Sequence, residues 1–223
     1  MQANRLLASL PRKCYRELAE RLVPVSLVFG EVLYEPGATI REVYFPGRSV
    51  VSLLTMVEGR GALEVGLVGR EGMVGIPLAL GIGVSPVRAL VQGGGGALRM
   101  SATSFRKALG ASLPLQQRLH RYAYALMAQI TQIAACNRFH VLEARLARLL
   151  LMTRDRVGSG EFRLTHEFLA HMLGVRREGV SGAASALQRR GLIGYRRGDI
   201  RIVDDAGLEA ASCGCYALVR QRA

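Results

Sequence analysis

Three patterns of hydrophobic and polar residues follow one another along the chain: a short helical pattern, a series of short strands and a longer helical region. Residues 3–22 carry leucines at helical spacing among arginine and glutamate, interrupted at Pro11, which predicts a short amphipathic helix. From Val25 onward, short runs rich in Val, Leu, Tyr and Phe are separated by turn sequences, among them EPG at 35–37 and FPG at 45–47. Such short strands favour a roll or sandwich, because closing the sheet hides unpaired strand edges.

Four consecutive glycines at 93–96 interrupt this strand-rich part. A phosphate-binding loop would continue into Lys-Ser/Thr and the start of a helix, and neither follows here. The glycines are therefore expected to form a mobile hairpin tip.

The hydrophobic period becomes helical at about residue 113. Apolar side chains then recur at steps of three or four residues and form one stripe, composed of Leu115, Leu119, Tyr122, Leu126, Ile130 and Ile133. Such a stripe either packs onto its own chain or pairs with its twin across a two-fold axis. A further amphipathic helix is predicted from about Val141 to Arg156, and the sequence GSG at 158–160 ends it.

The segment 165–191 has the pattern of two helices joined by a tight turn. Thr165 suits a helix N-cap and Glu167 suits the positive end of the helix dipole, so a helix is predicted from there to Leu173. Gly174 can adopt the left-handed conformation that ends it, and a second helix is predicted from about Arg176. Small and apolar residues stand where the two helices would cross, at Leu169, Ala170, Leu173, Val175, Val180 and Ala183.

A basic hairpin is predicted directly after the second helix. Residues 193–195 and 200–202 alternate as strands around two arginines and a Gly-Asp turn. Between Arg163 and Arg201 stand eight arginines and three acidic residues, a net charge of +5 around one helix and its hairpin. Helical hairpins with a glycine turn also occur in enzymes, but the basic hairpin that follows favours a DNA-binding winged helix.

These motifs resemble one family. The segment LTHEFLAHMLGVRREGV at 164–180, followed by GLI at 191–193, resembles the DNA-binding domain of the cyclic AMP receptor protein and FNR (Crp/Fnr) family of bacterial transcription regulators. Upstream, LYEPG at 33–37, VYF at 43–45 and GREG at 69–72 resemble the β-roll of that family's cyclic-nucleotide-binding-like domain. The apolar stripe falls where the family's dimerisation helix lies, so the resemblance covers nearly the whole chain.

The resemblance implies DNA-contacting roles for residues of the winged helix. In the family an Arg-Glu pair at the start of the recognition helix reads base edges, and Arg177 and Glu178 occupy that place; an arginine fork matches guanine, and a carboxylate accepts from cytosine. Where the best-known members carry another arginine, this chain has Gly182, so its operator is not expected to match theirs. Further expected base contacts are Arg176 and Ser181, and expected backbone contacts are Thr165, Arg163, Arg189, Arg190, Arg196 and Arg197.

The expected sensor lacks the family's usual ligand residues. Cyclic-nucleotide binders of the family carry a Gly-Glu-Leu segment for the ribose and an Arg-Ser/Thr pair for the phosphate, whereas the segments here read GIP at 75–77 and SPVRA at 85–89. Cyclic AMP is therefore not expected, and Arg88 is kept as a candidate contact for an anionic effector. An iron-sulfur cluster is not expected either, because Cys14 stands alone near the N-terminus, and no haem ligand stands out.

The four cysteines, Cys14, Cys136, Cys213 and Cys215, are too scattered for a disulfide framework, which fits a reducing compartment. Cys213 and Cys215 form a close pair, but the histidines show no spacing that would complete a metal site. We therefore expect no metal centre and no bound cofactor.

Composition agrees with a globular protein that meets an anionic partner. The 223 residues suit one large domain or two small ones, and the formal net charge is +13. Such a charge favours nucleic acid or an anionic membrane surface. The least charged stretches, 72–87 and 122–137, are too short and too interrupted to span a bilayer. No secretory signal is recognised, so the cytoplasm is the expected location.

Together these patterns predict an α+β chain in three parts: a β-roll with an N-terminal helix at 1–112, a dimerisation helix at 113–137 and a winged helix-turn-helix domain at 138–223. The expected function is sequence-specific transcription regulation by a homodimer on an inverted repeat in double-stranded DNA. The roll is expected either to bind an unidentified effector or only to scaffold the dimer. A pair of recognition helices enters successive major grooves only across a two-fold axis, which is why the paired stripe is preferred.

The resemblance further implies RNA polymerase as a partner. The alternative function is a non-specific architectural DNA-binding or membrane-surface protein. No nucleophile, base or metal group stands at catalytic spacing, so an enzyme is not expected.

Overall fold

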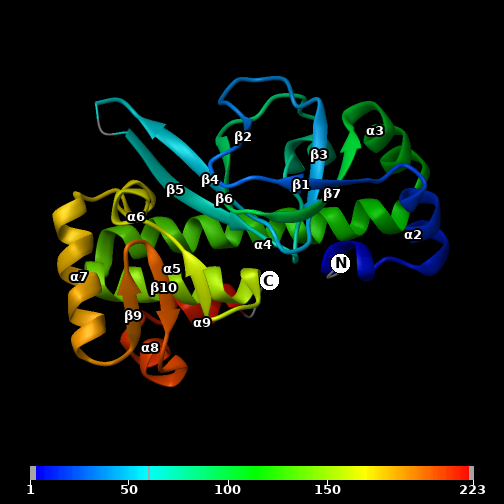
Figure 1. Cartoon of the computed structure of the whole chain (residues 1–223). Helices are drawn as coiled ribbons and strands as arrows, with labels where there is room; N and C mark the ends of the chain where they lie inside the picture. The colour runs from blue at the N-terminus through cyan, green and yellow to red at the C-terminus, as the bar shows by residue number, and fades with distance from the viewer. Residues whose placement is uncertain (1–3, 60, 221–223) are drawn as a thin grey trace. The chain divides into compact units, whose positions relative to one another are not determined.

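A computed structural model describes residues 4–59 and 61–220 of the chain (Figure 1). By its internal contacts the chain divides into two compact units. The first comprises Met1–Leu53 and Leu67–Met127, and the second comprises Leu54–Gly66 and Ala128–Ala223. The division falls inside the long helix α4 (Leu113–Phe139), and Leu54–Gly66, from the hairpin of β4 and β5, belongs to the second unit. Strands dominate before that helix and helices dominate after it, which confirms the α+β class.

Two sheets make up the strand-rich part, in the orders β1-β7-β3 and β2-β6-β4-β5. Val43 and Phe45 on one sheet and Val91 on the other are fully buried, which is the burial expected of a closed roll. The strands are β1 (Val23–Leu27), β2 (Val32–Tyr34), β3 (Glu42–Pro46), β4 (Val50–Val57), β5 (Gly61–Val68), β6 (Arg88–Gly93) and β7 (Gly95–Ser101).

The glycines at 93–96 do not form the hairpin tip that the sequence predicted. They carry the chain from β6 in one sheet to β7 in the other, and Gly95 and Gly96 pair with Leu27 and Ser26 of β1. Gly95 has a φ of +155°, and a Cβ there would lie 3.0 Å from the backbone of Arg48 and Ser49. The prediction was wrong because a close approach of two backbone segments requires glycine just as a turn does.

Short helices flank the roll. The predicted N-terminal helix is split at Pro11 into α1 (Arg5–Ala8) and α2 (Arg12–Ala19). The amide of Asn4 donates to the carbonyls of Pro46 and Gly72 and so ties α1 to the roll. A 3₁₀ helix, η1 (Ile76–Leu80), and the helix α3 (Ala102–Ala111) complete this part.

The long helix α4 (Leu113–Phe139) begins where the sequence predicted. Its apolar stripe is largely buried within the single chain: Leu115 and Leu119 are fully buried, and Leu126 and Ile133 are 5% and 3% exposed. Tyr122 and Ile130 are half-buried, and the Tyr122 hydroxyl donates to the carbonyl of Met73. The choice of Leu115, Leu119, Leu126 and Ile133 as dimer-interface residues is therefore corrected, because they are buried within their own chain, while for Tyr122 and Ile130 the choice stays a prediction.

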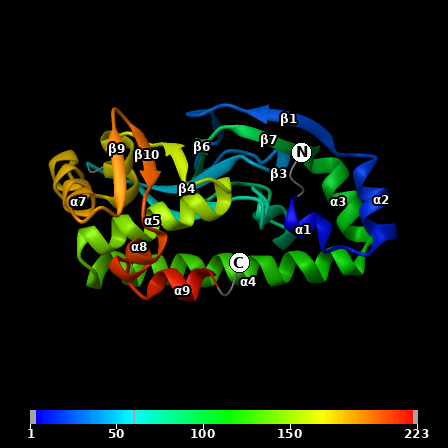
Figure 2. The same ribbon diagram turned by 60° about the horizontal axis from the view of Figure 1, so that its bottom comes forward.

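The C-terminal unit is built around α5 (Leu142–Val157), which contacts every other helix of the winged-helix part (Figure 2). Leu146, Leu149, Leu150 and Leu151 are at most 1% exposed and form much of its core. The strands β8, β10 and β9 make one small antiparallel sheet in that order. The elements after α5 are β8 (Glu161–Arg163), α6 (His166–Leu173), α7 (Arg177–Arg189), β9 (Ile193–Arg196), β10 (Asp199–Ile202), α8 (Asp205–Ala211) and α9 (Cys215–Arg220).

Within the described residues, no helix has both the length and the apolar character that crossing a membrane requires.

Candidate DNA-binding site

Two helices joined by a glycine turn form the centre of the site. The Thr165 hydroxyl accepts a hydrogen bond from the amide of Phe168 at 3.2 Å and caps α6, as its position predicted. Gly174 ends α6 with a φ of +63°, and the amide of Val175 donates back to the carbonyl of Ala170. A side chain at 174 would be strained in this backbone conformation, so glycine is needed at the turn.

Apolar residues hold α6 and α7 together at the predicted positions. Leu169, Leu173 and Val180 are at most 2% exposed, and Ala170 and Ala183 are below 10%. A Cβ at Gly179 would lie 3.1 Å from the Leu142 side chain, so that glycine permits α7 to approach α5 closely. The packing fixes which face of α7 stays outside.

The first turn of α7 presents the residues expected to read bases. Arg176, Arg177 and Glu178 are all exposed, and α7 lies at the edge of its unit in both views (Figures 1 and 2). Neither Arg177 nor Glu178 has an ion-pair partner among the described residues. Both charged groups are therefore available to a ligand.

Ser181 differs from its neighbours on α7. Its hydroxyl lies 2.9 Å from Nδ1 of His166 and donates to the carbonyl of Arg177 at 3.1 Å. The ring of His166 stacks on that of Tyr195, with centroids 4.2 Å apart. Burial, and then the charge of Arg177, lower the pKa of His166. Ser181 thus helps to join α7 to α6 and the hairpin, a use of the residue that the sequence did not indicate.

The basic hairpin, formed by β9 and β10, pairs with β8 to make a three-stranded wing. Arg197 and Gly198 form its turn with φ values of +52° and +92°, the two positive angles that a type I′ turn requires. The sequence placed this turn one residue later and did not predict β8. A Cβ at Gly198 would lie 3.4 Å from Thr165 and 3.8 Å from Arg163, so the wing tip is next to the start of α6.

The structure exposes all six side chains expected to contact the DNA backbone. The proximity of the wing tip to Thr165 and Arg163 brings part of this set together. Arg190 differs in that it forms an ion pair with Glu143 at 2.6 Å, which neutralises part of its charge. In the roll, the candidate effector residue Arg88 is likewise paired, with Glu35 at 2.9 Å, so an anion at Arg88 would compete with that carboxylate.

A second group of chemically active residues lies in the same unit, and the sequence analysis missed it. The side chains of Cys136, His140, Cys213 and Cys215 converge so that their ligand atoms all lie within 4.8 Å of one another. The structure thus places His140 beside the three cysteines, a proximity that was not predicted from the sequence, while the expectation of no metal centre stays a prediction. The available signal was the pair of short spacings, four residues between Cys136 and His140 and two between Cys213 and Cys215.

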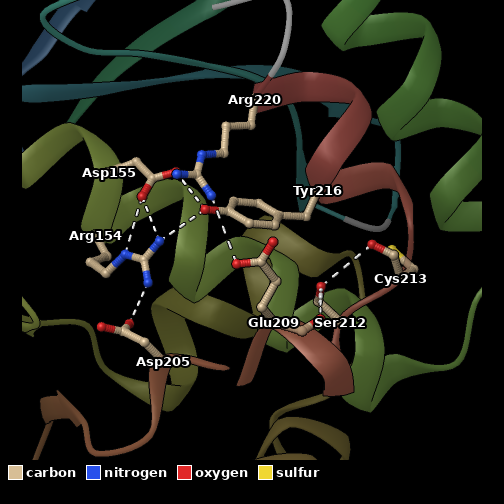
Figure 3. A network of polar contacts seen from close by, with 8 residues as sticks. All are labelled: Arg154, Asp155, Asp205, Glu209, Ser212, Cys213, Tyr216 and Arg220. Carbon is tan, nitrogen blue, oxygen red and sulfur yellow. Dashed lines mark hydrogen bonds and ion pairs between the residues drawn. The ribbon is translucent and has the colours of Figure 1, made fainter. Parts of the chain in front are cut away.

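Polar contacts anchor the C-terminal helices to α5 next to this group (Figure 3). The guanidinium of Arg154 contacts the carboxylates of Asp155 and Asp205 and donates to the Tyr216 hydroxyl at 2.9 Å. The Tyr216 hydroxyl in turn donates to Asp155 at 2.8 Å. Burial and the hydrogen bond to Asp155 raise the pKa of Tyr216 to about 12. Tyr216 therefore remains a hydrogen-bond donor at neutral pH.

The fold and the exposed recognition helix define a winged-helix DNA-binding protein that also carries a β-roll. Residues 144–211 match the model of the Crp-like helix-turn-helix domain. Residues 144–211 therefore form a Crp-like helix-turn-helix domain, the kind of DNA-binding domain that the sequence resemblance indicated for this part of the chain. No curated protein sequence matches the chain.

Solved structures share the fold beyond the matched domain. FixK2 from Bradyrhizobium japonicum has a TM-score of 0.73 and 17% identity, and the alignment covers 86% of this chain and 98% of FixK2. A CRP-family transcriptional regulator from Thermus thermophilus has a TM-score of 0.71 and 21% identity, with 84% and 96% coverage. The c-di-GMP responsive regulator CLP from Xanthomonas campestris has a TM-score of 0.69 and 16% identity, with 86% and 99% coverage.

Proposed function

We propose that the chain regulates transcription as a homodimer that recognises an inverted repeat in double-stranded DNA. The observation that carries the proposal is the exposure of Arg177 and Glu178 on the first turn of α7. A buried pair would exclude base reading, whereas an exposed arginine and glutamate can match guanine and cytosine edges in the major groove. The exposed arginines of the wing supply contacts to phosphates on either side.

The dimer is proposed to form through the exposed face of α4. Tyr124 and Met127 are 64% and 59% exposed and stand three residues apart, with exposed Thr131 and Ala134 continuing the same face. Pairing this face across a two-fold axis would cover large apolar side chains that one chain leaves in contact with water. The buried stripe on the opposite side of α4 then serves the chain's own core.

Selection of duplexes from a random pool with the purified full-length chain tests the proposal. We expect enrichment of an inverted repeat whose half-sites lie about 10 base pairs apart, because two recognition helices on a two-fold axis reach successive major grooves. Running the selection with and without a cell metabolite extract also tests for an effector at the roll. Addition of RNA polymerase to the selected duplex tests the partner that the family resemblance implies.

A pool without an enriched motif would overturn the proposal. Binding that also collapses steeply with rising salt and yields to non-specific competitor DNA would favour the architectural alternative, since purely electrostatic binding carries no sequence information. Enrichment of a single half-site would retain base reading and overturn the dimer.

A further inference from the structure

Four ligand-bearing side chains meet at the end of α4. Cys136 and His140 are four residues apart, and the amide of His140 still donates to the carbonyl of Cys136 at 3.1 Å, so both project from one side of a helical turn. Cys213 and Cys215 come from the connection between α8 and α9. The distance between the sulfurs of Cys136 and Cys213 is 3.4 Å, and Cys215 Sγ lies 3.5 Å from Nδ1 of His140.

These distances suit one tetrahedral ion. Zinc bonds to sulfur at about 2.3 Å and to histidine nitrogen at about 2.0 Å, so tetrahedral angles place two sulfurs about 3.8 Å apart and a sulfur and a nitrogen about 3.5 Å apart. A multinuclear iron-sulfur cluster would distribute its ligands over several metal ions, whereas here all four donor atoms lie within 4.8 Å of one another. We propose that Cys136, His140, Cys213 and Cys215 bind one Zn²⁺ ion in a structural site.

The neighbouring charges suit such a centre. Zn²⁺ with three thiolates and a neutral imidazole carries a net charge of about −1. Arg148 of α5 is 3% exposed, its Nε has no acceptor within the described part of the chain, and its other polar contact is the sulfur of Met152 at 3.3 Å. A buried guanidinium without an anion is costly. A zinc-thiolate centre beside it would supply the missing negative charge.

A further contact orients one of the sulfurs. The amide of Gln132 donates to Cys215 Sγ at 3.0 Å. Hydrogen bonds of this kind orient a thiolate ligand and stabilise its charge.

The number and burial of the ligands indicate a structural role. Three cysteines and one histidine complete a tetrahedral shell and leave no position for substrate. Cys136 is fully buried, Cys213 and Cys215 are 8% and 3% exposed, and His140 at the surface provides a route for the ion. Since the ligands come from both ends of the C-terminal unit, the ion would fix α9 to the end of α4. Figure 3 shows Cys213 beside the polar contacts that hold the same helix.

Metal analysis of the full-length chain tests the proposal. After reconstitution with Zn²⁺ under reducing conditions and removal of excess metal, we expect about one zinc ion per chain. Replacement by Co²⁺ should give the intense visible absorption of a tetrahedral thiolate site. A mercurial that modifies thiols should release the ion in proportion to the cysteines modified.

Variants separate a ligand role from a general effect of losing a thiol. Cys136→Ser and Cys215→Ser should each lower zinc content at least several-fold. Cys14→Ser is the matched control, because Cys14 is also a buried free thiol but belongs to the first unit and is not one of the four clustered residues; its Sγ lies 3.1 Å from the Ser112 hydroxyl. It should retain the wild-type zinc content. His140→Cys should retain the ion as well, since a thiolate can replace the imidazole.

Three results would overturn the proposal. The first is a wild-type chain that takes up under about a tenth of an equivalent of Zn²⁺ and gives no Co²⁺ spectrum. The second is a Cys136–Cys213 disulfide, found by mass spectrometry, that persists until a reductant is added and whose reduction restores no metal binding. The third is equal metal loss in Cys14→Ser and in the ligand variants. The wild-type measurements decide the outcome even if a ligand variant fails to fold.

Discussion

Arg177 and Ser181 lie one turn apart on α7, yet their surroundings differ. The guanidinium of Arg177 is exposed, whereas the Ser181 hydroxyl is occupied by His166 and by the Arg177 carbonyl. Sequence position alone ranked both as base contacts. Arg177 therefore remains a candidate for base contacts. Ser181 instead helps to hold α7 against α6 through its contact with His166.

Replacement of Arg177 by alanine is expected to weaken operator binding by about 1–3 kcal/mol and to relax the preference at one base position. The reason is loss of the two hydrogen bonds that a guanidinium can donate to guanine. The control is Arg197→Ala in the turn of the wing, which should weaken binding to all sequences alike. Fluorescence anisotropy titrations on the selected operator and on a scrambled duplex measure both effects. Equal losses on the two duplexes for Arg177→Ala would contradict base reading.

His166 is expected to make the winged helix sensitive to acid. Its pKa is lowered from the ordinary value of 6.5 by burial and then by Arg177, and its ring also contacts Ser181 and Tyr195. As the pH falls below 6.5 the unfolded chain binds a proton at this site before the folded chain does, so the stability present above that pH is lost on acidification through the folded pKa.

Urea unfolding followed by circular dichroism at a series of pH values measures this effect. The free energy of unfolding of the wild-type chain should fall more between about pH 7.5 and pH 5 than that of His166→Asn. Asparagine keeps a polar side chain of similar reach but does not titrate. Parallel pH profiles would assign the acid sensitivity to other groups.

At the scale of elements, hydrophobic period and capping residues predicted α5, α6, α7, β9 and β10 of the C-terminal unit, but not β8, α8 or α9. The predicted bounds of α5 and α6 and the predicted start of α7 lie within a residue or two of the observed ones, because Thr165, Gly158 and Gly174 are local signals. The strand β8 was missed because its three residues carry no period of their own. Its formation depends on pairing with β10, and a single sequence does not display that partner.

The difference between local sequence signals and partners distant in the sequence also explains the other errors of prediction. A helical stripe on α4 shows that one face is apolar, but it does not show whether that face meets the same chain or a second copy. The glycines at 93–96 allow a tight turn and a close crossing equally well. The cluster at Cys136 and Cys213 joins residues 77 positions apart, and no local pattern links them.

Tyr216 is expected to stabilise the attachment of α9 to α5. It is 1% exposed, and its hydroxyl joins Arg154 to Asp155 (Figure 3). Tyr216→Phe should reduce the free energy of unfolding by roughly 1–3 kcal/mol, because the phenyl ring fills the space but leaves those partners without their shared hydroxyl. Tyr15→Phe, at an exposed site on α2, is the control and should change little. Chemical denaturation of both variants compares them, and equal effects would contradict a role for the hydroxyl.

At the scale of the whole molecule, charge and assembly act together. A net charge of +13 draws the chain to any polyanion, so charge alone cannot select an operator. Selectivity is proposed to come from pairing two recognition helices at a fixed separation. The free energy of each weak base contact is then added across two half-sites, while the electrostatic part is shared with every DNA sequence.

Tyr124→Glu is expected to convert the dimer to a folded monomer with weakened operator binding, because it places a charge within the proposed interface. Tyr15→Glu introduces the same change on an exposed site of α2 and should leave the dimer intact. Light scattering coupled to size exclusion measures the mass, and circular dichroism checks the fold. A Tyr124→Glu variant that remains dimeric would exclude this face of α4.

Gly182 gives the recognition helix an open position. It is exposed on α7, and a Cβ built there would meet nothing within 4 Å. A longer side chain can therefore be accommodated without repacking, and alanine or arginine would also favour the helix by about 1 kcal/mol relative to glycine. A library of side chains at this one position, on an unchanged scaffold, would therefore test whether the proposed operator preference can be altered and which new base each side chain selects.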